Sequence, residues 1–126
     1  MSKITAEILI KMGMPMRLRG FKYIVEAVDI ASAEGEVYGA LTKIIYRTIA
    51  KKHKKSVGTV EKSIRTAISK TWDGGDLQFL REVMLAGNCV FFRVPTNGEF
   101  ISCLCDYECI FDGETSGDAY DNFLRA

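Results

Sequence analysis

The amino-acid sequence predicts an all-α fold of about six helices with a central helix-turn-helix. Apolar residues recur at three- and four-residue spacing through most of the chain, which is the periodicity of helices that bury one face. Glycines and prolines divide this pattern into separate helices. Residues 89–94 have the composition of a strand but no evident partner strand, so we expect a connecting segment there.

A chain of 126 residues, of which 48% are hydrophobic, suits one domain with a single core. We expect the domain to span residues 1–110 and an acidic, loosely ordered tail to occupy residues 111–126. No apolar run approaches the roughly 18 residues of a membrane span. Glu7 falls where a signal peptide would continue its apolar stretch. A cytoplasmic protein with no membrane partner is therefore predicted.

Three helices are expected in the first half of the chain. The first stops at Gly13, because Pro15 forbids its continuation. Gly20 opens the second, which ends near Gly35, and the third ends in a lysine cluster that suits the helix dipole. Their buried stripes are, in order, Ile4, Ile8, Leu9 and Met12; Phe21, Ile24, Val25, Val28 and Ala31; and Leu41, Ile44, Ile45 and Ile49.

Three further helices are expected in the second half. The fourth ends at Asp73-Gly74-Gly75, and Asp76 can cap the fifth, which runs toward Gly87. Thr96 and Glu99 have the spacing of a capping box at the start of the sixth. The core residues of these helices are, in order, Val60, Ile64, Ala67, Ile68 and Trp72; Leu77, Leu80, Val83 and Met84; and Phe100, Ile101 and Leu104.

The cysteines and the one histidine do not form a recognisable chemical site. Cys103, Cys105 and Cys109 have the spacing C-x-C-x-x-x-C, with Cys89 distant, and so lack the paired C-x-x-C knuckles of structural zinc sites. We predict small buried or half-buried thiols and no metal or other cofactor, with a zinc site as the alternative. His53 is expected to be a partly buried helix residue, not a ligand or a base. Without a set of nucleophile, base and orienting group, an enzyme is not predicted.

The net charge of +1 hides a strong asymmetry along the chain. Residues 1–72 carry 14 lysines and arginines against six acids, a balance of +8, and residues 73–126 carry three arginines against ten acids, a balance of −7. The first part can therefore face a polyanion, while the second repels it or meets another protein.

A helix-turn-helix is predicted between Ile49 and Arg65. Ala50 is the small residue needed where the first helix touches the second, and Val60 and Ile64 anchor the second helix to the domain. The pattern alone also fits a helical packing motif that never binds DNA. If the second helix does enter the major groove of double-stranded DNA, its outer face displays Thr59, Lys62, Arg65, Thr66 and Ser69.

Candidate DNA contacts follow from the chemistry of these side chains. Arg65 and Lys62 suit guanine acceptors, and Glu61 could accept from cytosine N4. Thr59 and Thr66 could touch a thymine methyl or a phosphate. The residues expected at phosphates are Lys51, Lys54, Lys55, Ser56 and Ser69.

Many stretches of the chain match one known family nearly without gaps. They include Gly13-Met14-Pro15, Gly20-Phe21-Lys22-Tyr23, Glu26-Ala27, Leu41-Thr42-Lys43-Ile44-Ile45-Tyr46, Ile49-Ala50-Lys51-Lys52, Val60-Glu61-Lys62-Ser63-Ile64-Arg65, Ala67-Ile68, Trp72 and Pro95-Thr96-Asn97-Gly98-Glu99-Phe100-Ile101. From roughly Ile4 to Asp106 the sequence resembles the C-terminal DNA-binding effector domain of the stage-zero sporulation master response regulators.

The resemblance implies a six-helix transcription regulator, associated with the nucleoid, that binds operators with a core like TGTCGAA, often in tandem. It implies that Glu61, Lys62 and Arg65 face bases, and that two copies meet as a homodimer on adjacent sites through the helix beginning near Thr96. In the family, the region matching about Leu77 to Gly87 touches the RNA polymerase sigma subunit, and this chain matches that region poorly.

The chain departs from the family at several sites. The family has arginine where this chain has Thr59 and Lys62, asparagine in place of Lys54 and histidine in place of Thr66. Lysine at position 62 keeps the charge but loses the planar fork that pairs with guanine. The chain starts at the first helix of the effector domain, without a phosphoacceptor receiver domain, so we expect a gene product that binds without phosphorylation control; an excised domain is the alternative.

A second function is compatible with the same residues. The acidic C-terminal half would suit a protein-interaction modulator, which pairs with a full-length regulator and alters its operator occupancy without reading DNA well itself.

Overall fold

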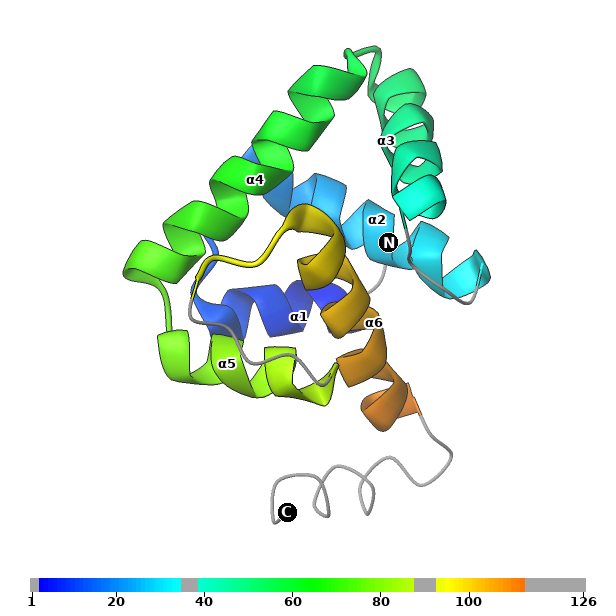
Figure 1. The fold of residues 1–126 in the computed structure, drawn as a ribbon. Coiled ribbons are helices and arrows are strands. Elements are labelled where there is room, and N and C mark those ends of the chain that lie inside the picture. Colours follow the sequence, from blue (N-terminus) through cyan, green and yellow to red (C-terminus); the bar gives the residue numbers. More distant parts are fainter. Residues whose placement is uncertain (1–2, 35–38, 88–92, 113–126) are drawn as a thin grey trace.

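The computed structural model describes residues 3–34, 39–87 and 93–112, and every regular element in these ranges is an α-helix (Figure 1). The predicted all-α fold of six helices is confirmed. The helices are α1 (Lys3–Met12), α2 (Arg19–Glu34), α3 (Gly39–His53), α4 (Val57–Gly74), α5 (Leu77–Ala86) and α6 (Asn97–Asp112).

Two predictions fall partly on residues without a described structure. The connecting segment expected at residues 89–94 lies outside the described residues except for Arg93 and Val94, which are not helical. The predicted domain boundary at residue 110 falls in the last turn of α6, and residues 113–126 of the expected tail lie outside the description.

Helix α2 is the centre of the fold, because it packs against α1, α3, α4 and α6. In Figure 1, α3 and α4 rise above it and meet at the top, while α1 and α5 lie below and α6 runs downward from α4. One apolar core joins all six helices. Its largest fully buried side chains include Leu9, Met12, Ile24, Ile45, Ile49, Ile64, Ile68, Leu80, Met84, Phe100, Ile101 and Tyr107. Among the described helices, none is long and apolar enough to span a bilayer.

Among the side chains of α3 that the structure describes, which do not include the predicted Leu41, the buried stripe differs from the prediction at one position. Ile44 is 52% exposed, whereas Tyr46 is buried. The inward face of this helix is formed by Ile45, Tyr46, Ile49 and Ala50. Adjacent residues of a helix are separated by about 100°, so a stripe centred slightly later along the chain turns Ile44 to solvent. In α5 the prediction also missed Phe79, which is buried, while Leu77 is only half-buried.

A close backbone approach fixes the distance between α2 and α4. A Cβ atom placed on Gly20 would lie 2.2 Å from the carbonyl oxygen of Ser63 and 2.6 Å from Cβ of Ala67. Only glycine leaves room for this contact. The buried residues of α4 (Val60, Ile64, Ala67, Ile68 and Thr71) lie on one face, so the opposite face of this helix is turned toward solvent.

Candidate DNA-binding surface

A tight turn joins α3 to α4. Lys54 adopts a left-handed conformation with φ of 56°, and the backbone N–H of Lys55 donates to the carbonyl oxygen of Ala50 at 2.9 Å. This bond satisfies one of the carbonyl groups left open at the end of α3. The left-handed region is unfavourable for most residues other than glycine and asparagine. The predicted helix-turn-helix is therefore present, with Lys54 at its most constrained position.

Ser56 caps the N-terminus of α4. Its Oγ accepts a hydrogen bond from the backbone N–H of Thr59 at 3.1 Å and donates to the Thr59 hydroxyl at 2.8 Å. Such a cap satisfies an open N–H group of the first helical turn. Two of the predicted DNA contacts thus bond to each other in the free domain, and their hydroxyls stabilise the helix start.

The last turn of α3 is tied to α2 by a buried carboxylate. Glu26 accepts from Lys52 Nζ at 2.6 Å, and its other oxygen lies 2.7 Å from His53 Nε2. Burial alone would raise the pKa of Glu26, but the hydrogen bonds and charges of Lys52 and His53 together hold it below its ordinary value. His53 also stacks against Tyr23, with ring centroids 5.2 Å apart. It is partly buried, as predicted.

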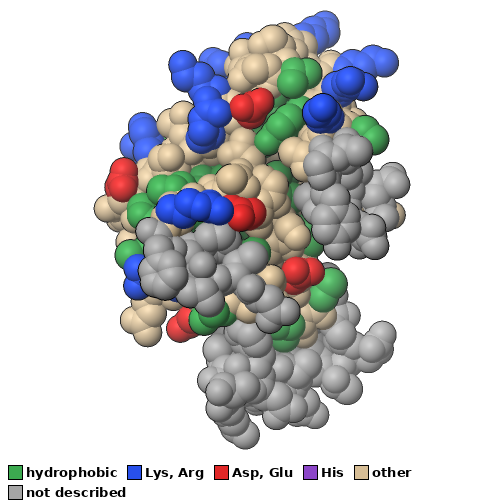
Figure 2. Space-filling model, in the orientation of Figure 1, with side chains coloured by type: hydrophobic (Ala, Val, Ile, Leu, Met, Phe, Trp, Pro, Cys, Tyr) green, Lys and Arg blue, Asp and Glu red, His purple; other side chains and the backbone are tan. Residues whose placement is uncertain are grey.

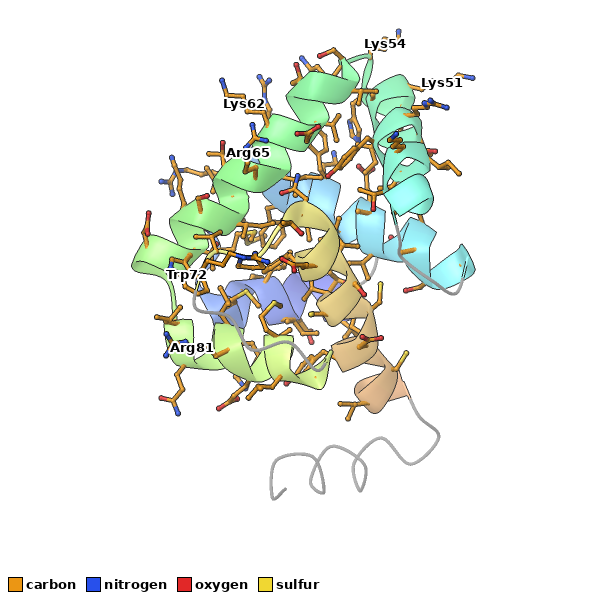
Figure 3. All side chains as sticks on the ribbon, in the orientation of Figure 1. Lys51, Lys54, Lys62, Arg65, Trp72 and Arg81 are labelled. Atoms are coloured by element: carbon orange, nitrogen blue, oxygen red, sulfur yellow. The ribbon has the colours of Figure 1, made fainter. Side chains whose placement is uncertain are left out.

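The predicted contact residues differ in exposure (Figure 3). Figure 3 shows Lys62 and Arg65 on the outer side of α4 and Lys51 and Lys54 at the tip where α3 and α4 meet. The exposed residues are Lys51, Lys54, Lys55, Ser56, Lys62, Arg65 and Thr66, and the partly exposed ones are Thr59, Glu61 and Ser69. All ten residues are thus at least partly accessible to solvent.

Two of these residues form an ion pair along α4. Arg65 Nη1 donates to Glu61 Oε1 at 3.1 Å, and the side chains are 59% and 46% exposed, respectively. An exposed pair at this spacing contributes only about 0.3–0.5 kcal/mol. Each member can therefore leave its partner for a base at little cost.

Two adjoining hollows run along this side of α4. One, of about 570 Å³, is lined by Thr42, Lys43, Tyr46, Arg47, Val57 and Glu61. The other, of about 430 Å³, is lined by Tyr46, Glu61, Arg65, Ser69 and residues 94–98. Lys43 and Arg47 are exposed cations that the sequence interpretation did not single out. Their four-residue spacing on an outer helix face could have identified them. Figure 2 shows lysine and arginine side chains gathered over α3 and α4.

The start of α6 closes the second hollow. The predicted capping box is confirmed: Thr96 Oγ1 accepts from the N–H of Glu99 at 3.2 Å, and Glu99 accepts from the N–H of Thr96 at 2.8 Å. Arg93 adds two hydrogen bonds to the Glu99 carboxylate, at 2.9 and 3.1 Å. Arg93 and the Thr96 N–H together lower the pKa of Glu99 to about 2.

The cysteines within the described residues lie on α6. Cys103 is buried, Cys105 is half-buried and Cys109 is exposed. Burial raises the pKa of Cys105 to about 11, so its thiol stays protonated at neutral pH. Among the residues that the structure describes, no three His, Cys, Asp or Glu side chains converge on a potential metal site. Cys89 lies outside the described residues.

Comparison with protein-family models identifies the domain. Residues 5–107 match the family described as the C-terminal domain of the sporulation initiation factor Spo0A. The chain belongs to this family. It is therefore a DNA-binding effector domain of the kind found in a sporulation response regulator, and it acts in transcription regulation. The match covers α2 to α5 completely and most of α1 and α6, and it includes the helix-turn-helix of this Spo0A C-terminal domain.

Proposed function

We propose that this domain is a sequence-specific transcription regulator that inserts α4, about residues 57–72, into the major groove of operators with TGTCGAA-like elements. The observation that carries this proposal is the exposure of Lys62, Arg65 and Thr66 on the side of α4 away from its buried residues Val60, Ile64, Ala67, Ile68 and Thr71. A recognition helix has to be anchored on one face and open on the other. Lys62, Arg65 and Thr66 face away from the core and are thus available to base edges.

The base-reading roles follow from hydrogen-bonding capacity. Arg65 can donate two bonds to guanine, and Lys62 can donate to one acceptor. Glu61 can accept from cytosine N4, while Thr59 and Thr66 offer methyl and hydroxyl groups. Because Arg65 and Glu61 are already paired at 3.1 Å, a guanine and a cytosine on neighbouring base pairs could separate them without leaving either charge unpaired.

We call the surface formed by Thr59, Glu61, Lys62, Arg65 and Thr66 the reading face. The residues proposed to contact phosphates lie around it. Lys51, Lys54, Lys55 and Ser56 occupy the tip, and Ser69 lies farther along α4. We add Lys43 and Arg47, because both line the 570 Å³ hollow together with Val57 and Glu61 of α4. Contacts of this kind hold a protein in register on the duplex and make binding depend on salt.

Three wider roles belong to the same proposal. The domain acts in the cytoplasm at the nucleoid. Two copies on tandem elements meet through α6, which begins beside α4. The sigma subunit of RNA polymerase contacts α5, whose residues Arg81 and Leu85 are exposed. An alternative role, in which the domain pairs with a full-length regulator without reading DNA well, is supported by the excess of acids after residue 72.

The deciding experiment compares a duplex carrying two tandem TGTCGAA-like elements with a scrambled duplex of equal length, at about 150 mM salt. A preference of about a thousandfold or more is expected of an operator reader. Arg81→Ala is the control variant: it should bind both duplexes as the original domain does, because Arg81 lies on α5, away from the tip (Figure 3). Equal weak binding to both duplexes would contradict the proposal. Recovery of a full-length regulator in pull-downs without DNA would then favour the alternative.

A further inference from the structure

One buried carboxamide joins three helices next to the reading face. Asn97, the first residue of α6, is only 8% exposed. Its Nδ2 donates to the hydroxyl of Tyr46 on α3 at 3.0 Å and to the backbone carbonyl of Glu61 on α4 at 3.0 Å. Both hydrogens of the amide are therefore used, each by a different helix of the helix-turn-helix.

The two hollows explain why this contact matters. Tyr46 and Glu61 line both of them, and Asn97 lines the smaller one, so the carboxamide lies where they adjoin. Side chains that border open space have few packing partners there. Apolar packing is also non-directional, whereas a hydrogen bond to a single carbonyl fixes both distance and rotation. The packing of Val60 and Ile64 holds this part of α4 against the core, and the bond from Asn97 adds a directional restraint on the side that borders the hollows.

Glu61 links the carboxamide to DNA readout. Its carbonyl receives the bond from Asn97, and its carboxylate receives the bond from Arg65. Lys62 is the next residue in the same turn. Asn97 itself is held in place by the capping box of Thr96 and Glu99 on either side of it.

We propose that Asn97 is a positioning residue for DNA recognition: through the Glu61 carbonyl, it sets the orientation of the α4 turn that carries Lys62 and Arg65. This inference rests on the proposed function and extends it from the reading face to a residue buried behind it. Asn97 need not touch DNA for this role.

The test uses Asn97→Leu, which keeps the branched shape and the neutral charge of the side chain but cannot donate a hydrogen bond. Tyr46→Phe is the matched control, because it removes the bond to α3 and keeps the bond to α4. Binding to the operator and to the scrambled duplex is measured at a temperature where all proteins are fully folded. We expect Asn97→Leu to lower the ratio of the two affinities about tenfold, with scrambled binding and its salt dependence unchanged. Tyr46→Phe should stay within about threefold of the original ratio.

A second measurement does not depend on DNA. Amide hydrogen exchange in the free domain should become about tenfold faster at residues 61–65 in Asn97→Leu, while α1 and α5 are unchanged. A folded variant that keeps both the ratio and the exchange rates of α4 would overturn the inference. Should Asn97→Leu fail to fold, Asn97→Ser, which is compatible with a helix start, replaces it under the same criteria. If the original domain shows no preference for the operator, the proposed function fails, and the exchange rates alone decide whether Asn97 positions α4.

Discussion

The carboxylate of Glu26 lies 2.7 Å from Nε2 of His53, and this contact connects the central helix α2 to the last turn of α3. Lys52 bonds to the other carboxylate oxygen at 2.6 Å. The turn at Lys54 follows directly. A single side chain of α2 therefore holds the end of α3 directly before the turn from which α4 departs.

Replacing this carboxylate should weaken the whole domain. We expect Glu26→Gln to lower the free energy of unfolding at pH 7 by about 1–3 kcal/mol, because the amide loses the negative charge that pairs with Lys52 and keeps only one acceptor oxygen for the two partners. Urea unfolding at pH 7 measures the change. Glu7→Gln, at an exposed position on α1, is the control and should stay within about 0.5 kcal/mol of the original domain. Equal stability of the two variants would show that the Glu26 contact is energetically neutral.

The close approach of α2 and α4 predicts that two glycine-to-alanine substitutions change stability in opposite directions. Gly20→Ala should destabilise the domain by about 1–3 kcal/mol, because its Cβ would collide with the Ser63 carbonyl. At Gly58, in the first turn of α4, the nearest atom to an added Cβ is Ser56 Oγ at 4.0 Å. Gly58→Ala should therefore stabilise by about 0.5–1 kcal/mol. Thermal unfolding of both variants checks the contrast, and a shared sign would argue against the contact.

A substitution at Lys54, the left-handed residue of the turn, should raise stability and lower DNA affinity. Asparagine tolerates a φ of 56° better than lysine, so Lys54→Asn should raise the free energy of unfolding by about 0.5–1 kcal/mol. It also removes a charge from the tip. Affinity for operator and scrambled duplex should then fall by the same factor, and the salt slope should decrease by about 0.9. A loss confined to the operator would instead make Lys54 a base-reading residue.

The ion pair of Arg93 and Glu99 at the start of α6 predicts that the stability of the domain falls in acid. The folded-state pKa of Glu99 is lowered from 4.5 to about 2, so its contribution to stability is complete above pH 4.5 and is lost as the pH falls toward 2. Glu99→Gln removes this contribution at all pH values. Its stability deficit against the original domain should accordingly be constant above pH 5 and shrink below pH 4.5. Chemical unfolding across this range would refute the assignment if the deficit did not change.

The side chains proposed to read bases and those proposed to bind phosphates should respond differently to truncation. Arg65→Ala should cost about 1–3 kcal/mol on the operator and relax specificity at one base pair. Lys55→Ala and Arg47→Ala should weaken binding to all sequences alike and reduce the salt slope by about 0.9 each. Titrations at several salt concentrations distinguish the two classes. Equal losses on operator and scrambled duplex for Arg65→Ala would count against base readout.

Local sequence signals were sufficient for most of the fold. Gly13, Asp76 and the capping box of Thr96 and Glu99 act on neighbouring residues, so their effects on helix ends could be predicted. The choice between Ile44 and Tyr46 as the buried residue could not, because both are large and apolar and they flank Ile45, about 100° to either side of it on the helix circumference.

The same limit applies to the candidate site: its residues within one helix were predictable, and its contacts between helices were not. The outer residues of α4 follow from helical periodicity within one segment. The contact of Gly20 with Ser63, by contrast, joins residues far apart in the sequence, as do the bonds of Asn97 to Tyr46 and Glu61. Nothing local distinguishes Asn97 from any polar residue of a first helical turn. Such contacts depend on the packing of whole helices, which periodicity does not specify.

The tip where α3 meets α4 carries Lys51, Lys54 and Lys55, whereas α5 and most of α6, from the acidic half of the chain, lie at the other end of the molecule (Figure 1). If α4 enters the major groove as proposed, this arrangement places the lysines of the tip nearest to the duplex. Positive charge at the leading end of a protein steers its approach to a polyanion over distances longer than atomic contact. The fold therefore favours productive encounters, and their rate falls as added salt shortens the reach of the field.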